Sequence, residues 1–177
     1  MPAVAVPPAR LSAELRQGRS ADLSRRRWAI GMSFAGAGIG MVVGAYQTGM
    51  LKRLPDILPG KLWDAEKVDA SDYAYKRAQT PDGLLMALTY IITACLVGAG
   101  GKDRDTQQPW LPLAASAKAW IDLFSALKLA REEYQDNRAL CSWCQVATLF
   151  TATTALLSAP EALRAGRRLL SDGDLLA

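Results

Sequence analysis

Two cysteines separated by two residues are the side chains of this chain best suited to chemistry. Cys141-Ser142-Trp143-Cys144 stands at the start of an apolar, threonine-rich run that extends from Gln145 to Ala159. The first N–H groups of a helix have no partner inside the helix and carry a partial positive charge, so a thiolate is favoured there. A Cys-x-x-Cys pair in this position is typical of a redox-active centre with a lowered thiol pKa. The sequence therefore predicts thiol–disulfide chemistry at Cys141 and Cys144.

Polar side chains continue along the helix that this run predicts. Gln145, Thr148 and Thr151 lie on the same broad face as the two cysteines, because residues three and four apart are stacked on a helix. Such a face suits a ligand that is mostly apolar and carries carbonyl groups, and a quinone fits that description. Alternatively, the threonine hydroxyls bond back to carbonyls of their own helix. Ser71 and Asp82, from a long preceding loop, are further candidates for binding the ligand.

The composition excludes several kinds of site. The 177-residue chain contains no histidine, which excludes Ser–His and Cys–His nucleophile pairs, haem attachment through Cys-x-x-Cys-His and the commoner zinc sites. Because the chain has three cysteines, a four-cysteine site is impossible as well, and we expect no metal. The net charge is +4, but the basic residues cluster beside an apolar segment and are not interleaved with aromatic ones. This favours a membrane surface over nucleic acid as the partner.

The elements that position the cysteines are four apolar segments. They are Trp28–Leu51, Gly83–Gly100, Trp110–Ala130 and Cys141–Ala159, the last closed by Pro160. A bilayer requires about 20 apolar residues per helix, so the second is short, and the third is interrupted by charges. Proline cannot continue a helix without disruption. The pattern predicts an all-α fold: an integral membrane four-helix bundle with a long first extracytoplasmic loop, Lys52 to Asp82.

The basic residues predict the orientation of these segments. The N-terminal arm, the short middle connection and the C-terminal tail together carry more Lys and Arg than the other two loops. By the positive-inside rule, both termini are cytoplasmic and the cysteines lie at the outer face, where disulfides persist. The predicted organisation is a basic cytoplasmic arm (1–27), a transmembrane bundle (28–168) and a cytoplasmic tail (169–177). The alternative, a twin-arginine export signal at Ser24–Trp28, lacks a clear cleavage site.

Three further features concern packing more than chemistry. Gly36, Gly40 and Gly44 form a smooth stripe on the first segment, which predicts close helix packing or, alternatively, a homodimer. Lys118 and Asp122 are one turn apart in the third segment and are expected to neutralise each other. Cys95, deep in the second segment, is expected to be a small buried hydrophobic residue.

In its layout the chain resembles the vitamin K epoxide reductase family, over most of Trp28 to Arg168. The resemblance is most specific in three stretches. They are Lys67–Tyr75 leading to Thr80–Gly83, Ala117–Ala119 with Asp122, and Cys141–Cys144 with Pro160–Ala162. The chain looks like a short bacterial member without a fused thioredoxin-like domain. The resemblance implies a multi-pass protein of the bacterial inner membrane whose Cys141 and Cys144 pass electrons from thiols to a quinone of the ubiquinone or menaquinone type.

Two positions depart from the family pattern. The first outer loop contains no cysteine, whereas the family usually carries an electron-relaying pair there, so a thioredoxin-like partner or a small thiol is the expected donor. Thr148 stands where the family often has a hydroxyl-bearing aromatic residue. Two other functions remain open. One is a non-enzymatic four-helix membrane subunit with a structural Cys141–Cys144 disulfide, and the other is a small transporter that uses Lys118 and Asp122.

Overall fold

The computed structural model describes residues 7–174, with side chains described as far as Ser171. The first six residues of the predicted arm and the last three of the predicted tail lie outside this range. Every regular element within it is helical, which confirms the all-α prediction. The elements are α1 (Pro8–Gln17), α2 (Ala21–Gln47), α3 (Ala65–Asp69), the 3₁₀ helix η1 (Asp72–Tyr75), α4 (Asp82–Gly98), α5 (Arg104–Gln107), α6 (Trp110–Asn137) and α7 (Ser142–Asp174).

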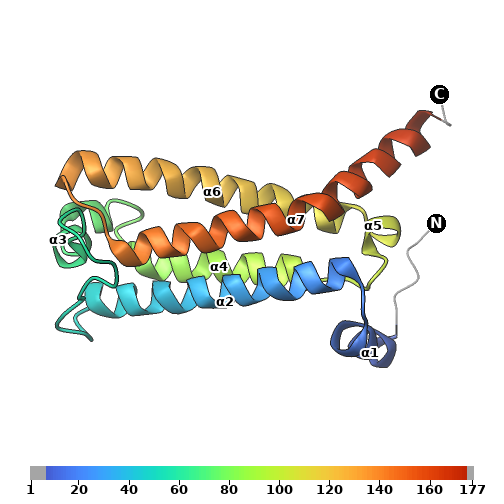
Figure 1. The fold of residues 1–177 in the computed structure, drawn as a ribbon, viewed down its shortest axis with the longest axis horizontal. Helices are drawn as coiled ribbons and strands as arrows, with labels where there is room; N and C mark the ends of the chain where they lie inside the picture. The colour runs from blue at the N-terminus through green and yellow to red at the C-terminus, as the bar shows by residue number, and fades with distance from the viewer. Residues whose placement is uncertain (1–6, 175–177) are drawn as a thin grey trace.

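The four long helices α2, α4, α6 and α7 lie side by side (Figure 1). Helix α2 packs against α4 and α7, and α6 packs against α7 and α4. The loop between α2 and α4, residues 48–81, contains α3 and η1 and lies at the end where α7 begins, whereas α1 and α5 lie at the opposite end (Figure 1). Helices α2 and α7 are long and apolar enough to cross a membrane, and α4 is apolar but shorter.

Helix α2 begins before the apolar segment that the sequence outlines. The side chain of Ser20 accepts a hydrogen bond from the N–H of Leu23 at 3.1 Å, and Asp22 lies in the first turn, so a polar cap starts the helix at Ala21 and not at Trp28. Arg26 consequently lies within α2, and its side chain is buried. Its guanidinium donates to five successive carbonyls from Val97 to Gly101, at the end of α4 and just beyond it, which no N–H of the helix reaches.

The last two long helices also extend beyond their predicted ends. The hydrophilic stretch after Ala130 continues α6 to Asn137, and the chain turns at Arg138 in the left-handed region, with φ 53°. Helix α7 passes through Pro160, so the predicted end there was wrong. The turn after the proline is held by tertiary contacts, because Glu161 forms a buried ion pair with Arg104. The C-terminal part of α7 turns away from the other helices (Figure 1).

The glycine stripe of α2 is covered by α4. A Cβ atom at Gly36 would meet the ring of Tyr90 at 2.4 Å, and one at Gly40 would meet the backbone N of Ala87 at 2.6 Å. Close packing of two helices within the chain therefore accounts for the stripe, and no face of it remains for a homodimer. Cys95, in contrast, is exposed and not buried as predicted.

Substitution of two glycines on the same helix tests this packing. We expect Gly40→Ala to destabilise the protein by about 1–3 kcal/mol, because α2 and α4 must move apart. Gly38→Ala is the matched control, since no atom lies within 4 Å of its added Cβ. The control is expected to be neutral or stabilising by up to about 1 kcal/mol, because alanine favours a helix over glycine. Thermal unfolding in detergent measures both, and equal midpoints for the two variants would contradict the packing.

Candidate active site

The start of α7 positions the two cysteines. Cys141 immediately precedes the helix, and its Sγ accepts a hydrogen bond from the N–H of Cys144 at 3.3 Å, as the side chain of a capping residue does. The N–H of Cys141 itself donates to the carboxylate of Glu133, from the end of α6. Both sulfurs therefore lie at the positively polarised end of the helix, as the sequence predicted.

The loop between α2 and α4 is fastened over this helix start. Asp56 accepts hydrogen bonds from the hydroxyl of Ser142 at 2.7 Å and from its N–H at 3.3 Å, and the indole of Trp143 donates to the carbonyl of Pro55 at 2.9 Å. The backbone of Leu140 pairs with Leu62 and Asp64. Under this cover Cys141 is completely buried. Cys144, and not Cys141 at the helix start, is the more accessible residue of the pair.

The hydrogen bonds of Asp56 provide a test of this cover. We expect Asp56→Ala to weaken the start of α7 by about 0.5–2 kcal/mol, as the loss of a capping side chain does. Cys141 should then react faster with a maleimide reagent, because the loop that buries it is less firmly held. Asp64→Ala is the matched control, since Asp64 lies in the same loop but caps α3. Unchanged labelling of Cys141 in Asp56→Ala would show that other contacts hold the loop.

Acidic residues lie near the cysteines, and Asp69 and Glu133 are buried. Gln47 of α2 donates to Asp82 at 2.6 Å and to Asp69 at 3.2 Å, and so ties the start of α4 to the end of α3. Burial raises the pKa of Asp69 to about 7. A hydrogen bond with Cys144 lowers the pKa of the Cys141 thiol, but burial and the Asp69 carboxylate outweigh it and raise the pKa above its ordinary value. The lowered thiol pKa that the sequence suggested is therefore not found at Cys141.

An apolar cavity of about 270 Å³ adjoins the site. Residues of α4, α6, α7 and the loop that contains α3 and η1 line it. Of the residues predicted to bind a ligand, Gln145, Thr148 and Asp82 line this cavity together with Cys144. The hydroxyl of Thr148 donates back to the carbonyl of Cys144 at 2.9 Å. The structure does not bring Ser71 to the cavity, because its hydroxyl bonds to the carbonyl of Val68 in the loop.

Sequence reasoning missed several residues of this site. Asp69, Glu133 and Tyr90 all line the cavity. Tyr90 of α4 reaches Thr151 of α7 with its hydroxyl at 2.6 Å, and so places an aromatic hydroxyl group beside the helix that carries the cysteines. The one sequence signal was the stretch Lys67–Tyr75, which contains Asp69 and carries part of the family resemblance. Glu133 had no such signal, since it stands in the hydrophilic stretch after Ala130, where the predicted third segment ends.

The predicted pair in α6 is confirmed. Lys118 and Asp122 form an ion pair at 2.5 Å, and Thr93 of α4 bonds to both of them at 3.0 Å. Asp122 also lines the cavity. The two charges neutralise each other within the packed helices, which is the expected arrangement for ionisable residues in an apolar environment.

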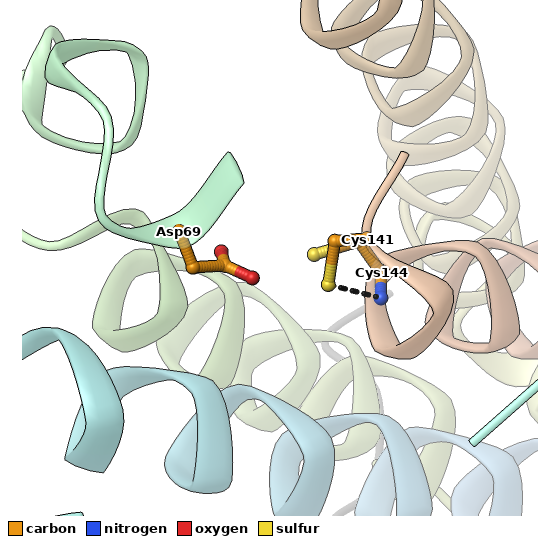
Figure 2. A group of neighbouring side chains, drawn as sticks. All are labelled: Asp69, Cys141 and Cys144. Atoms are coloured by element: carbon orange, nitrogen blue, oxygen red, sulfur yellow. Dashed lines mark hydrogen bonds between the residues drawn. The ribbon is translucent and has the colours of Figure 1, made fainter. Parts of the chain in front are cut away.

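The carboxylate of Asp69 points toward the sulfurs of Cys141 and Cys144 (Figure 2). One ligand atom from each of the three residues lies within 4.8 Å of the other two. The expectation of no metal rested on the absence of histidine and of a fourth cysteine. It did not foresee a carboxylate brought to the cysteine pair by the loop.

The described part of the chain is all-helical and has helices able to cross a membrane. A dithiol at the start of one of them adjoins an apolar cavity. Together these features define a membrane-associated thiol redox protein. Comparison with family models agrees, since the model described as the vitamin K epoxide reductase family matches residues 26–159. The chain belongs to this family, and membership makes it a membrane-associated oxidoreductase in general terms. No curated protein and no solved structure matched the chain in the corresponding searches.

Proposed function

We propose that the protein is a membrane thiol oxidoreductase that passes electrons from thiols, through Cys141 and Cys144, to a quinone. The observation that carries this proposal is the position of Cys144, which lines an apolar cavity and contacts Cys141 at the start of α7. A sulfur placed in this way can exchange electrons with a ligand in the cavity, while its neighbour completes a disulfide.

Helices α2, α4, α6 and α7 are proposed to cross the bacterial inner membrane as a four-helix bundle, with residues 28–168 as the transmembrane domain. Each of these helices exposes large apolar side chains, which suit contact with lipid tails. They include Trp28, Phe34, Met41, Leu88, Ile91, Ile121, Phe124, Leu149 and Leu156. The arm and the tail, rich in arginine, are placed in the cytoplasm, so the loop between α2 and α4 lies outside.

The cavity fits the ring of a quinone of the ubiquinone or menaquinone type. Its walls are mostly apolar, with Leu85, Met86 and Leu129 among them, and polar groups are confined to a few positions. This is the usual composition of a small-molecule site. The side-chain amide of Gln145 is the proposed donor to a quinone carbonyl, and Thr148 and Asp82 are secondary candidates. A bound quinone supplies the chemistry of an acceptor of two electrons and two protons.

The chain's own residues perform the thiol half of the reaction. In the reduced state both S–H bonds are intact, and oxidation joins the two sulfurs in one S–S bond with release of two electrons and two protons. An external dithiol restores the reduced state by thiol–disulfide exchange, and is itself oxidised to a disulfide. A small thiol or a thioredoxin-like protein is the proposed donor. A protein donor requires the loop that covers Cys141 to open first.

Thiol trapping with and without a quinone tests the proposal. Purified, reduced Cys95→Ser protein in detergent is incubated anaerobically with a water-soluble ubiquinone analogue. It is then denatured, so that the buried Cys141 is accessible, and labelled with a maleimide reagent that adds mass. We expect two labelled thiols before the quinone is added and none afterwards, with one quinol formed per protein. A pair that is already oxidised and unchanged by dithiothreitol, or two thiols that survive the quinone, would instead support a membrane subunit without this activity.

A further inference from the structure

One oxygen of the Asp69 carboxylate has no nitrogen or oxygen partner among the described residues, and the thiol of Cys141 is the polar group that the carboxylate faces. Asp69 is buried, with 1% of its surface exposed, and its Oδ1 accepts the hydrogen bond from Gln47, which leaves Oδ2 alone. A buried carboxylate oxygen without a partner is costly, and native structures rarely retain one without a reason. The position of this oxygen therefore points to a ligand beside it.

The groups nearest to that carboxylate are the two sulfurs. Figure 2 shows the Asp69 side chain reaching from the loop toward Cys141 and Cys144, and the ligand atoms of all three lie within 4.8 Å of one another. Two cysteines separated by two residues are a recurrent half of tetrahedral zinc sites, and a carboxylate oxygen is an accepted zinc ligand. Thiolates select zinc over magnesium and calcium, which prefer oxygen ligands alone.

The surroundings of the three groups are also acidic. Glu133 accepts a hydrogen bond from the N–H of Cys141, and Asp82 shares the side-chain amide of Gln47 with Asp69. Arg77 lies over the ring of Tyr73, pairs with Glu132 and lies 3.8 Å from the carboxylate of Asp82. It therefore offsets the charge of Asp82, whereas the carboxylates of Asp69 and Glu133 form no ion pair among the described residues. An excess of carboxylates around a buried dithiol disfavours thiolates without a cation and favours a divalent cation among them.

We propose that the reduced protein binds one zinc ion through Cys141 Sγ, Cys144 Sγ and the carboxylate of Asp69, with the fourth position open to the cavity. Binding breaks two S–H bonds, forms two bonds from sulfur to zinc and releases two protons, and no electron is transferred. The same sulfurs cannot then form a disulfide. Zinc is thus a reversible inhibitor that holds the dithiol in the reduced state, and its binding does not depend on the quinone.

Metal binding is measured directly, without any activity assay. Reduced Cys95→Ser protein in detergent is titrated with Co²⁺, which reports thiolate ligands by charge-transfer absorption, and then with Zn²⁺ in competition with a chromophoric chelator. We expect one ion per protein, and no charge-transfer band after the dithiol has been oxidised to the disulfide. Asp69→Asn preserves the shape of the side chain and should weaken zinc binding by at least about tenfold, the lower end of what loss of a supporting contact costs a metal site.

Two control variants keep the inference falsifiable. Asp72→Asn changes an acidic residue of the same loop outside the three ligands and should leave the affinity unchanged, whereas Cys144→Ser should abolish the charge-transfer band. The helical circular dichroism of each variant shows that it is folded. Absence of stoichiometric binding overturns the proposal, and so does an affinity that Asp69→Asn leaves intact, because the carboxylate is then not a ligand. Zinc binding in a protein that does not reduce quinone would reject the proposed function and retain this site.

Discussion

Cys144→Ser is expected to abolish quinone reduction, with the rate falling by on the order of a thousandfold or more, to the uncatalysed background. Cys144 is the cysteine that lines the cavity, so its removal takes away the sulfur nearest to a bound quinone. Cys141→Ser is expected to be equally inactive although Cys144 remains, because a single sulfur cannot form the internal disulfide. The measurement is quinol formation under anaerobic conditions with dithiothreitol as the electron donor.

Cys95→Ser is the matched control for both substitutions. Cys95 is an exposed cysteine on α4, and it does not line the cavity. Its replacement should leave the rate within about twofold of that of the unmodified protein, as is usual for surface substitutions away from a site. Substantial quinone reduction by Cys144→Ser would mean that electrons reach the quinone by another route, and the proposed function would then be rejected.

The two inactive variants also separate the roles of the sulfurs. If Cys141 accepts the donor, Cys144→Ser accumulates a mixed disulfide at Cys141, since the resolving thiol is missing. The complete burial of Cys141 makes the opposite order worth testing, because a small thiol that enters through the cavity meets Cys144 first. Mass spectrometry of each variant after exposure to oxidised glutathione shows which cysteine carries the adduct.

The parts of the fold that could be predicted are those that depend on the local sequence pattern. Four apolar segments and a Cys-x-x-Cys pair before the last of them are visible without any tertiary information. The glycine stripe likewise predicts close contact, which α4 provides. Helix ends were less predictable. Ser20 caps α2 ahead of its apolar part, and Pro160 does not end α7, because contacts of the following turn hold the helix together.

The acidic half of the site could not be predicted, for a physical reason. Asp69 is far from Cys141 and Cys144 in sequence, and only the packing of the loop brings it to the sulfurs. Glu133 stands eight residues before Cys141, and it reaches the N–H of Cys141 because α6 continues to Asn137 and the chain then turns back. The expected thiolate stabilisation followed from the helix start alone. Burial and the Asp69 carboxylate oppose it, and they exist only in the folded chain. Local sequence therefore identified the reactive atoms but not their electrostatic environment.

The end of the molecule opposite the cysteines depends on one buried ion pair. Arg104 of α5 binds Glu161 of α7 with two hydrogen bonds of 2.7 Å, and both side chains are nearly inaccessible. The same guanidinium donates to carbonyls of Val97 and Ala99 at the end of α4. From the sequence, Arg104 was counted only as a cytoplasmic positive charge. In the structure it joins three helices.

Arg104→Ala is expected to destabilise the protein by about 3–5 kcal/mol, because it leaves the buried carboxylate of Glu161 without a partner. Replacing both residues, as Arg104→Met with Glu161→Leu, should recover much of this loss, since no charge then remains buried. Arg168→Ala is the control. Arg168 pairs with Asp105 at 2.8 Å but is half exposed, and such pairs contribute about 0–1 kcal/mol. Thermal unfolding in detergent measures all three variants. A double variant that is less stable than Arg104→Ala would show that the carbonyl contacts of Arg104, and not its charge on Glu161, hold this end of the molecule together.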